Sequence, residues 1–153
     1  MKVLVATEKP FAAAAVNGIR EIVEGAGHEL ALLEKYTEKE QLLAAVADAD
    51  ALIVRSDKVT AEVVAAAKQL KIVVRAGAGY DNLDLPSCTE RGVVAMNTPG
   101  QNSNAVAELA VGLMIYMSRN QFNPGTGCEL SGKTIGIQGF GNIGQQRRRS
   151  ASE

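Results

Sequence analysis

Five short apolar runs, separated by segments with helical spacing, restrict what this chain can fold into. Runs that are apolar throughout and four or so residues long are typical of strands buried on both faces of a parallel sheet. Alternation of such strands with helices predicts right-handed βαβ units. We therefore expect an α/β fold with a flavodoxin-like five-stranded parallel sheet, covered by helices on both faces. The expected strands are Val3–Ala6, Leu30–Leu33, Ala51–Val54, Lys71–Val74 and Val93–Met96.

The segments between these runs carry recognisable start and stop signals for helices. Proline suits the first position of a helix, and Ser, Thr and Asp suit the position before it. The first predicted helix begins near Pro10 and has apolar residues at helical spacing up to Ala26, and the second begins at a capping box over residues 37–40. Thr60 begins a third helix, which runs through Lys68. Asp84 and Pro86 begin a short fourth helix that closes at Gly92.

Composition and charge narrow the possible functions. The 153 residues are 46% hydrophobic and carry a net charge of −1, which gives no reason to expect nucleic acid or an anionic membrane as a partner. The longest apolar stretch, residues 105–117, is too short to cross a bilayer and contains Glu108. Cys88 and Cys128 lack metal-ligand spacing, and we interpret them as reduced thiols of a cytoplasmic protein. No metal site is expected.

The fourth expected strand ends in a candidate anion site. Arg75 is followed by Gly77-Ala78-Gly79, so a guanidinium and unhindered backbone N–H groups meet at one edge of the sheet. Ligands of open α/β sheets bind outside the carboxyl ends of the strands. Two plainer interpretations stay open. Arg75 can be solvated beside a tight turn, or it and Arg55 can form ion pairs with Asp57, Asp81 or Asp84.

A long apolar helix is expected from Asn102 or Ser103 to about Asn120. Its predicted core stripe is Val106, Leu109, Ala110, Leu113, Met114 and Met117, and Val111, Ile115 and Tyr116 lie on its other faces. A helix that is apolar nearly all round requires burial on more than one side. We therefore expect this chain to form a homo-oligomer.

A glycine-rich motif follows further along the chain. Thr134–Gln138 is expected to be a strand, and Gly139-Phe140-Gly141-Asn142-Ile143-Gly144 after it has the G-x-G-x-x-G spacing of a dinucleotide-binding turn.

Two longer motifs carry a resemblance to a known family. They are R-A-G-A-G-Y-D-N-L-D from Arg75 and N-T-P-(x)₂-N-(x)₃-V-A-E from Asn97. Together they resemble the D-isomer-specific 2-hydroxyacid dehydrogenases. The resemblance implies NAD as the cofactor and a small 2-hydroxy acid as the substrate, here a phosphorylated one because two arginines are present. It also implies a substrate-binding domain over residues 1–98, an interdomain helix and loop over 99–128, and the start of a Rossmann domain over 129–153.

The same resemblance assigns site residues. Ala78 stands where many members of the family have threonine. His28, the one imidazole, is expected at the surface, and no catalytic residue is assigned. The substrate-binding residues implied are Arg55, Ser56, Arg75, Gly77, Ala78 and Asn102, and the cofactor-binding residues are Ala78, Gly139, Gly141, Asn142, Ile143 and Gly144.

The resemblance runs from Met1 to about Gly144, and a polar tail follows. Arg147–Arg149 in it is interpreted as a solvated run, and the tail offers no apolar face for a helix. In the family, the catalytic arginine, glutamate and acid/base come after the glycine motif. We therefore expect a truncated oxidoreductase that is inactive alone and does not bind NAD at micromolar levels. The alternatives are a stand-alone, non-catalytic flavodoxin-like binding module and a dehydrogenase for another 2-hydroxy acid.

Overall fold

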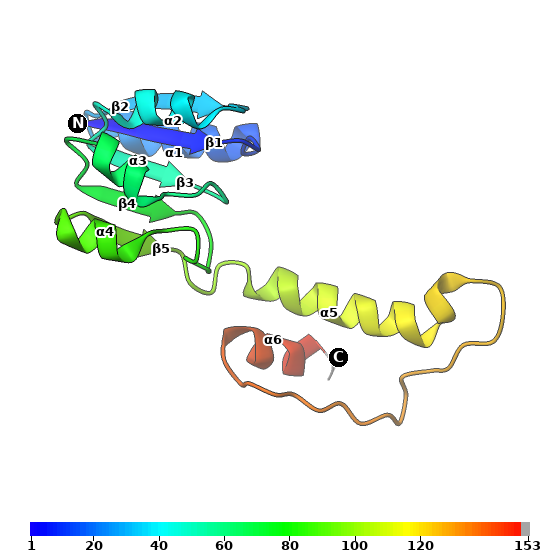
Figure 1. Ribbon diagram of the computed structural model, residues 1–153. Helices are drawn as coiled ribbons and strands as arrows, with labels where there is room; N and C mark the ends of the chain where they lie inside the picture. The colour runs from blue at the N-terminus through cyan, green and yellow to red at the C-terminus, as the bar shows by residue number, and fades with distance from the viewer. Residues whose placement is uncertain (151–153) are drawn as a thin grey trace. The chain divides into compact units, whose positions relative to one another are not determined.

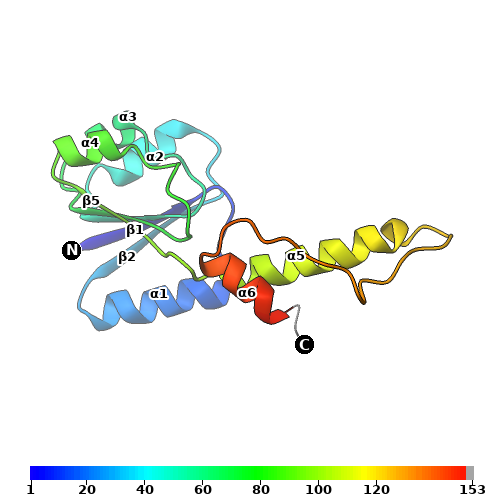
Figure 2. The same ribbon diagram turned by 90° about the horizontal axis from the view of Figure 1, so that it is seen from below.

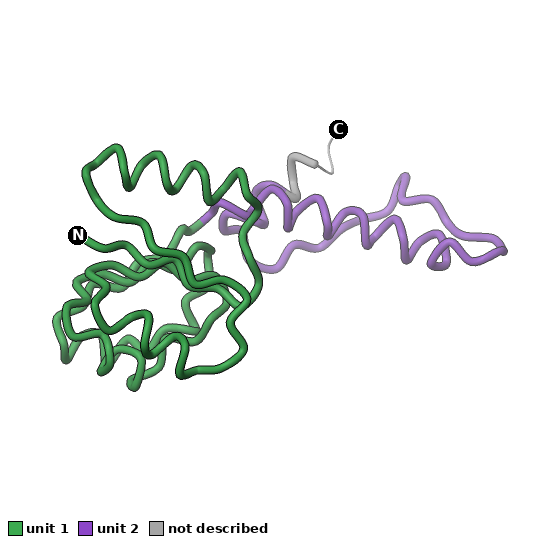
Figure 3. The backbone as a smooth tube through the Cα atoms, turned by 90° about the horizontal axis from the view of Figure 1, so that it is seen from above, with its two compact units in different colours: residues 1–99 green, residues 100–153 purple. Residues whose placement is uncertain are grey.

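The structure, a computed structural model, describes the backbone of residues 1–150 and the side chains of residues 1–146. The expectation about Arg147–Arg149 concerns side chains outside this range. The chain divides into two compact units, Met1–Pro99 and Gly100–Glu153, which Figure 3 distinguishes by colour. Each unit is described by itself.

The first unit is a parallel sheet of five strands joined by helices (Figure 1). The strands lie in the order β2-β1-β3-β4-β5, the arrangement of flavodoxin-like folds. This confirms the predicted α/β class and all five predicted strands. The elements are β1 (Lys2–Thr7), α1 (Ala13–Gly25), β2 (Glu29–Glu34), α2 (Lys39–Val46), β3 (Ala51–Val54), α3 (Ala61–Ala66), β4 (Ile72–Arg75), α4 (Leu85–Glu90) and β5 (Val94–Asn97).

The hydrophobic core lies between one face of this sheet and helices α2, α3 and α4, which Figure 2 shows together on the same side. Side chains alternate between the two faces of a strand, so Leu52 and Val54 of β3 enter the core together, and both are fully buried. Burying one such side chain contributes about 1.5–3 kcal/mol.

The other face of the sheet is less well covered than predicted. Helix α1 lies on this side (Figure 2), and none of its residues is buried. A helix about 10 Å wide covers roughly two strands spaced about 4.8 Å apart. Val94 and Met96 of β5 therefore remain 55% and 50% exposed. Helices therefore lie over both faces of the sheet, as predicted, but the cover on this face does not extend over β5.

Three helix starts differ in detail from the expectations. Helix α1 begins at Ala13, so Pro10 precedes it and is not its first residue. The side-chain oxygen of Gln41 accepts hydrogen bonds from the backbone N–H groups of Thr37 and Glu38, at 3.0 and 3.1 Å, so the capping box lies one residue later than predicted. Thr60 precedes α3, but its hydroxyl makes no hydrogen bond to the helix, which ends at Ala66.

The second unit contains α5 (Ser103–Ser118), a 3-10 turn over Asn120–Phe122 and α6 (Asn142–Ser150). The predicted core stripe of α5 is wrong for this unit, because Leu109 and Met117 are each 63% exposed. Within the described part of the helix, only Ser103 and Ala107 are buried. None of the described helices is both long enough and apolar enough to cross a bilayer.

The predicted strand Thr134–Gln138 is also wrong. The segment has no regular secondary structure and pairs with no strand among the described residues. A strand is defined by hydrogen bonds to a neighbour, so apolar spacing alone does not create one.

Candidate functional site

The sheet aligns the residues of the candidate anion site. In the strand register, Arg75 at the end of β4 pairs with Val54 on one side and with Asn97 on the other. Arg55 and Ser56 follow Val54 directly and are exposed. Because parallel strands end at the same edge, Arg55, Ser56, Arg75 and the glycine-rich loop all lie at the carboxyl edge of the first unit.

The loop after β4 is fixed through its carbonyl groups. Asn97 Nδ2 donates to the carbonyl oxygen of Ala78 at 2.7 Å, and the Thr98 N–H donates to that of Gly77 at 2.9 Å. In contrast, the N–H groups of Ala78 and Gly79 donate to no acceptor among the described residues. The loop therefore presents two free donors beside Arg75, as a small anion requires.

The side chain of Arg75 lies directly over Gly77. A Cβ atom added to Gly77 would be 1.6 Å from Arg75 Nη1 and 2.4 Å from Cζ. Any other residue at position 77 would displace the guanidinium. The close approach of Arg75 therefore explains why residue 77 is a glycine. Arg75 Nε is buried and has no acceptor. Since an unsatisfied buried donor is costly, this nitrogen is a place where a ligand oxygen would lower the free energy.

The ion-pair interpretation of the two arginines is wrong for the described residues. Neither Arg55 nor Arg75 forms a salt bridge there. Asp57 accepts instead from the Tyr36 hydroxyl, and Asp84 caps α4 by accepting from the Ser87 N–H at 3.0 Å. The guanidinium of Arg75 is therefore available to pair with an anionic ligand.

Asn102 belongs to the second unit. It immediately precedes α5, is exposed, and makes no capping hydrogen bond with its side chain. The described geometry therefore brings five of the six expected substrate residues to one edge of the first unit and leaves Asn102 in the other unit.

The glycine motif forms the tight turn that a dinucleotide site requires. Gly139 has a φ of 88°, and a Cβ atom on Gly144 would be 2.2 Å from the carbonyl oxygen of Gly139. The chain then enters α6 at Asn142, so the backbone of the polar tail is helical up to Ser150. The space beside Gly141 is open. Open backbone ahead of a helix N-terminus fits a pyrophosphate group.

The remaining cofactor candidates lie around the same turn. Asn142 Nδ2 approaches Gly100, where an added Cβ atom would be 3.2 Å away, and Gly100 has a φ of 81°. Ile143 is 40% exposed. Ala78 lies in the first unit with the substrate residues, so it is not grouped with the turn here.

Sequence reasoning missed two residues at the carboxyl edge. Asn97 holds the glycine-rich loop through Ala78, and its position directly after the fifth apolar run was the available signal. Tyr36 donates to buried Asp57. Burial is the largest cause that raises the pKa of the Tyr36 hydroxyl, and this hydrogen bond is the next.

Both thiols are free, as predicted, and burial raises the pKa of Cys88. No cluster of three metal-ligating side chains occurs among the described residues.

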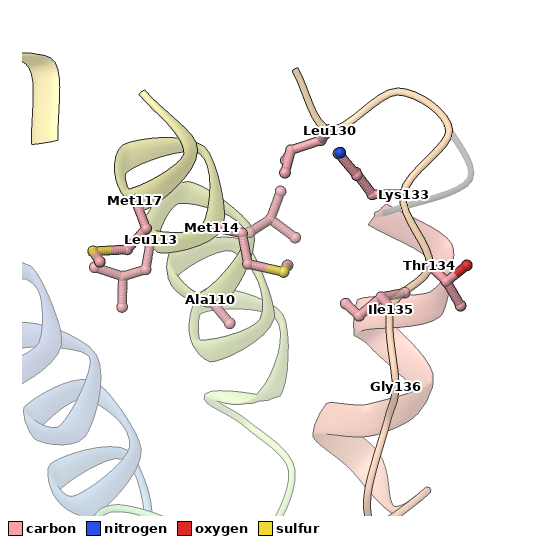
Figure 4. A pocket seen from close by; sticks show the side chains of 10 residues that line it. Ala110, Leu113, Met114, Met117, Leu130, Lys133, Thr134, Ile135 and Gly136 are labelled. Atoms are coloured by element: carbon pink, nitrogen blue, oxygen red, sulfur yellow. The ribbon is translucent and has the colours of Figure 1, made fainter. Parts of the chain in front are cut away.

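An apolar cavity of about 850 Å³ lies within the second unit, between α5 and residues 130–136. Figure 4 shows Met114 and Leu130 pointing into it from opposite walls, while Thr134 points away. Apart from Lys133 and Thr134, its lining residues carry no polar side chains, so the cavity is mostly apolar.

Comparison with known proteins gives consistent matches. The family model described as "D-isomer specific 2-hydroxyacid dehydrogenase, catalytic domain" matches residues 5–151. The match therefore continues past Gly144, where the resemblance was expected to stop. A hydroxypyruvate reductase from Thermotoga maritima is 42% identical over 137 residues, and D-3-phosphoglycerate dehydrogenase from Rattus norvegicus is 43% identical over 143 residues.

A solved structure is similar over almost all of this chain. It is the NAD⁺-bound 3-phosphoglycerate dehydrogenase from Entamoeba histolytica, with a TM-score of 0.94 and 53% identity over 99% of this chain and 50% of that one. The Thermotoga and rat matches cover 80% and 83% of this chain, but only 45% and 26% of those proteins. The chain thus spans half or less of the length of these three proteins.

Proposed function

The chain belongs to the D-isomer-specific 2-hydroxyacid dehydrogenase family, and from this premise we propose that it serves the NAD-dependent oxidation of D-3-phosphoglycerate. The observation that carries the proposal is the guanidinium of Arg75, which has no ion pair in the described structure and lies beside two free N–H groups. Relatives named for 3-phosphoglycerate support the choice of substrate.

In this proposal, the first unit recognises the charged groups of the substrate. Arg75 and the N–H groups of Ala78 and Gly79 hold one anionic group, because charge-assisted hydrogen bonds from a guanidinium and from backbone donors converge there. Arg55 lies at the end of the adjacent strand and is exposed, so it reaches a second anionic group. Two separate cations favour a substrate with both a carboxylate and a phosphate.

We assign the turn from Gly139 to Gly144 to the pyrophosphate of NAD. Gly139 and Gly144 allow the tight turn, and Gly141 leaves room for phosphate oxygens to approach the backbone. NAD held at this turn would supply a hydride acceptor for the carbon that bears the 2-hydroxyl group.

We further propose that the 153 residues alone bind the substrate anion without oxidising it. Oxidation of the hydroxyl needs a base, and the groups proposed around the anion are guanidinium, hydroxyl and backbone groups. His28 directly precedes β2 and so lies at the amino edge of the sheet, opposite the carboxyl edge. It is therefore too remote from Arg75 to act as that base.

Calorimetric titration of the 153-residue chain with D-3-phosphoglycerate tests the proposal. We expect saturable binding that Arg75→Ala weakens at least tenfold, since a hydrogen bond to a charged group contributes about 1.5–3 kcal/mol. The matched control is Arg20→Ala, because Arg20 forms an exposed pair with Glu24 on α1 and should leave binding unchanged. Equal binding by the two variants would contradict the assignment of Arg75.

A second candidate is the reduction of hydroxypyruvate, which the name of the Thermotoga maritima relative favours. Hydroxypyruvate carries one negative charge, so it needs only one of the two arginines. Titrations with D-3-phosphoglycerate, D-glycerate and hydroxypyruvate separate the candidates. If the chain prefers the phosphorylated acid and Arg55→Ala loses this preference, the result supports D-3-phosphoglycerate as the substrate.

We also propose that the protein forms a homo-oligomer through α5. Leu109, Leu113 and Met117 are each more than half exposed, and contiguous apolar surface of this kind is typical of an interface.

A further inference from the structure

Besides the apolar cavity of the second unit, a polar cavity lies in the first unit, where the strand order of the sheet changes direction. The chain runs outward from β1 to β2 and then returns to place β3 on the other side of β1. In open α/β sheets, the crevice at the carboxyl ends of two such strands is a general place for ligands. Here it holds a cavity of about 410 Å³, lined by residues that follow β1, β2 and β3.

The central group of this cavity is the carboxylate of Asp57. Its side chain is only 5% exposed. Oδ1 accepts two hydrogen bonds, from the Glu8 N–H at 2.7 Å and from the Tyr36 hydroxyl at 2.8 Å. Oδ2 accepts no hydrogen bond from any described residue, and Asp57 forms no ion pair in that part of the chain.

A buried carboxylate without a cation is unusual, because charges taken out of water are normally paired. Both donors to Asp57 are neutral groups, so they do not compensate its charge. A cation bound at Oδ2 would therefore lower the free energy of this buried carboxylate the most.

The other groups of the cavity agree with a cationic ligand that also carries a hydroxyl. Lys39 is neutralised by its ion pair with Glu62, and Glu8 and Lys58, which also line the cavity, carry opposite charges. The charge left over is that of Asp57. Thr60 Oγ1 is buried and has no hydrogen-bond partner, so it offers a donor and an acceptor to a polar ligand.

We propose that this cavity binds a small primary ammonium compound that bears a hydroxyl group. The ammonium donates to Asp57 Oδ2, and the hydroxyl pairs with Thr60 Oγ1. The site is separate from Arg75 and does not depend on the proposed substrate. Ser56 lines the cavity next to Arg55, so an occupant also contacts the chain segment that carries that arginine.

Ethanolamine is the probe for this site, because it is the smallest compound with both groups. In ¹H–¹⁵N spectra of the 153-residue chain, we expect saturable shifts at the amides of Glu8, Asp57 and Lys58. Ethylene glycol, which lacks the charge, and choline, whose methylated nitrogen cannot donate a hydrogen bond, should each bind at least tenfold more weakly. Equal shifts with the three compounds would overturn the proposal, as would no saturation with ethanolamine up to tens of millimolar.

Two substitutions localise the effect. Asp57→Asn keeps the shape and an acceptor but removes the charge, and it should weaken ethanolamine binding at least tenfold. Asp48→Asn is the control, because Asp48 is exposed and pairs with Lys2 away from the cavity. If Asp57→Asn does not fold, Thr60→Val decides, with an expected loss of at least threefold. Unchanged affinity in a folded Asp57→Asn or Thr60→Val variant refutes the assignment.

Discussion

Gly77→Ala is the substitution that most directly tests how the anion site is built. The new methyl group would lie 1.6 Å from Arg75 Nη1, and its three nearest atoms all belong to the side chain of Arg75. The guanidinium is the end of a flexible side chain, so it can move aside at little cost. The fold should therefore survive, and the lower entropy of the unfolded chain should offset part of the strain by about 0.4–1 kcal/mol. What changes is the position of the charge.

The expected loss of affinity follows from the lost contact. A hydrogen bond to a charged group contributes about 1.5–3 kcal/mol, which corresponds to roughly 10- to 150-fold in the dissociation constant at about 1.4 kcal/mol per factor of ten. Calorimetric titration with D-3-phosphoglycerate measures this loss, and urea unfolding measures stability on the same samples.

The control for this experiment is Gly18→Ala. Gly18 lies inside α1, and an added Cβ atom there meets nothing within 4 Å. This variant should gain about 0.5–1 kcal/mol in stability and leave the affinity unchanged. If Gly77→Ala binds within twofold of the parent chain, or loses affinity only because it unfolds, the reasoning about Arg75 fails.

Four further outcomes are expected. Gly144→Ala places a methyl group 2.2 Å from the carbonyl oxygen of Gly139, so it should raise the rate of amide hydrogen exchange in α6. Gly141→Ala is the control, because the space around Gly141 is open and exchange should not change. Similar exchange rates in the two variants would be evidence against the turn. Leu52→Ala, at a fully buried position, should cost about 2–5 kcal/mol in urea unfolding, and Ile22→Ala, at a 75% exposed one, should change stability by less than about 0.5 kcal/mol. Because the pKa of Tyr36 is raised in the folded state, its stabilising contribution is complete below its ordinary pKa of 10.0 and declines as the pH rises above it; Tyr36→Phe should flatten this alkaline loss of stability, and an unchanged pH profile would disprove the link. Light scattering should give a dimer or larger assembly that Leu113→Glu dissociates, and a monomeric parent chain would exclude assembly through α5.

The sheet could be predicted because its information is local. Each strand is an apolar run such as Ala51–Val54, and each connection contains a helix, as the crossover between parallel strands requires. The cap at Asp84 was equally predictable, since the residue and its partner Ser87 are three positions apart.

What could not be predicted depends on which surfaces meet. Residues 134–138 have the composition of a strand, but strand formation needs a partner, and α5 has an apolar stripe that the second unit leaves exposed. The hydrogen bond from Asn97 to Ala78 joins residues 19 positions apart, so it follows from the strand register and not from local spacing. The unpaired state of Arg75 is likewise a three-dimensional property, because three aspartates were close enough in sequence to pair with it.

The register of β3, β4 and β5 has a consequence for how this site can vary. Val54, Arg75 and Asn97 form one row across the sheet. Side chains along a strand alternate between faces, so a shift of β4 by one residue would turn the guanidinium to the opposite side. A slip by an odd number of residues inside β4 would therefore abolish anion recognition, and it would also turn the buried side chain of Val73 out of the core.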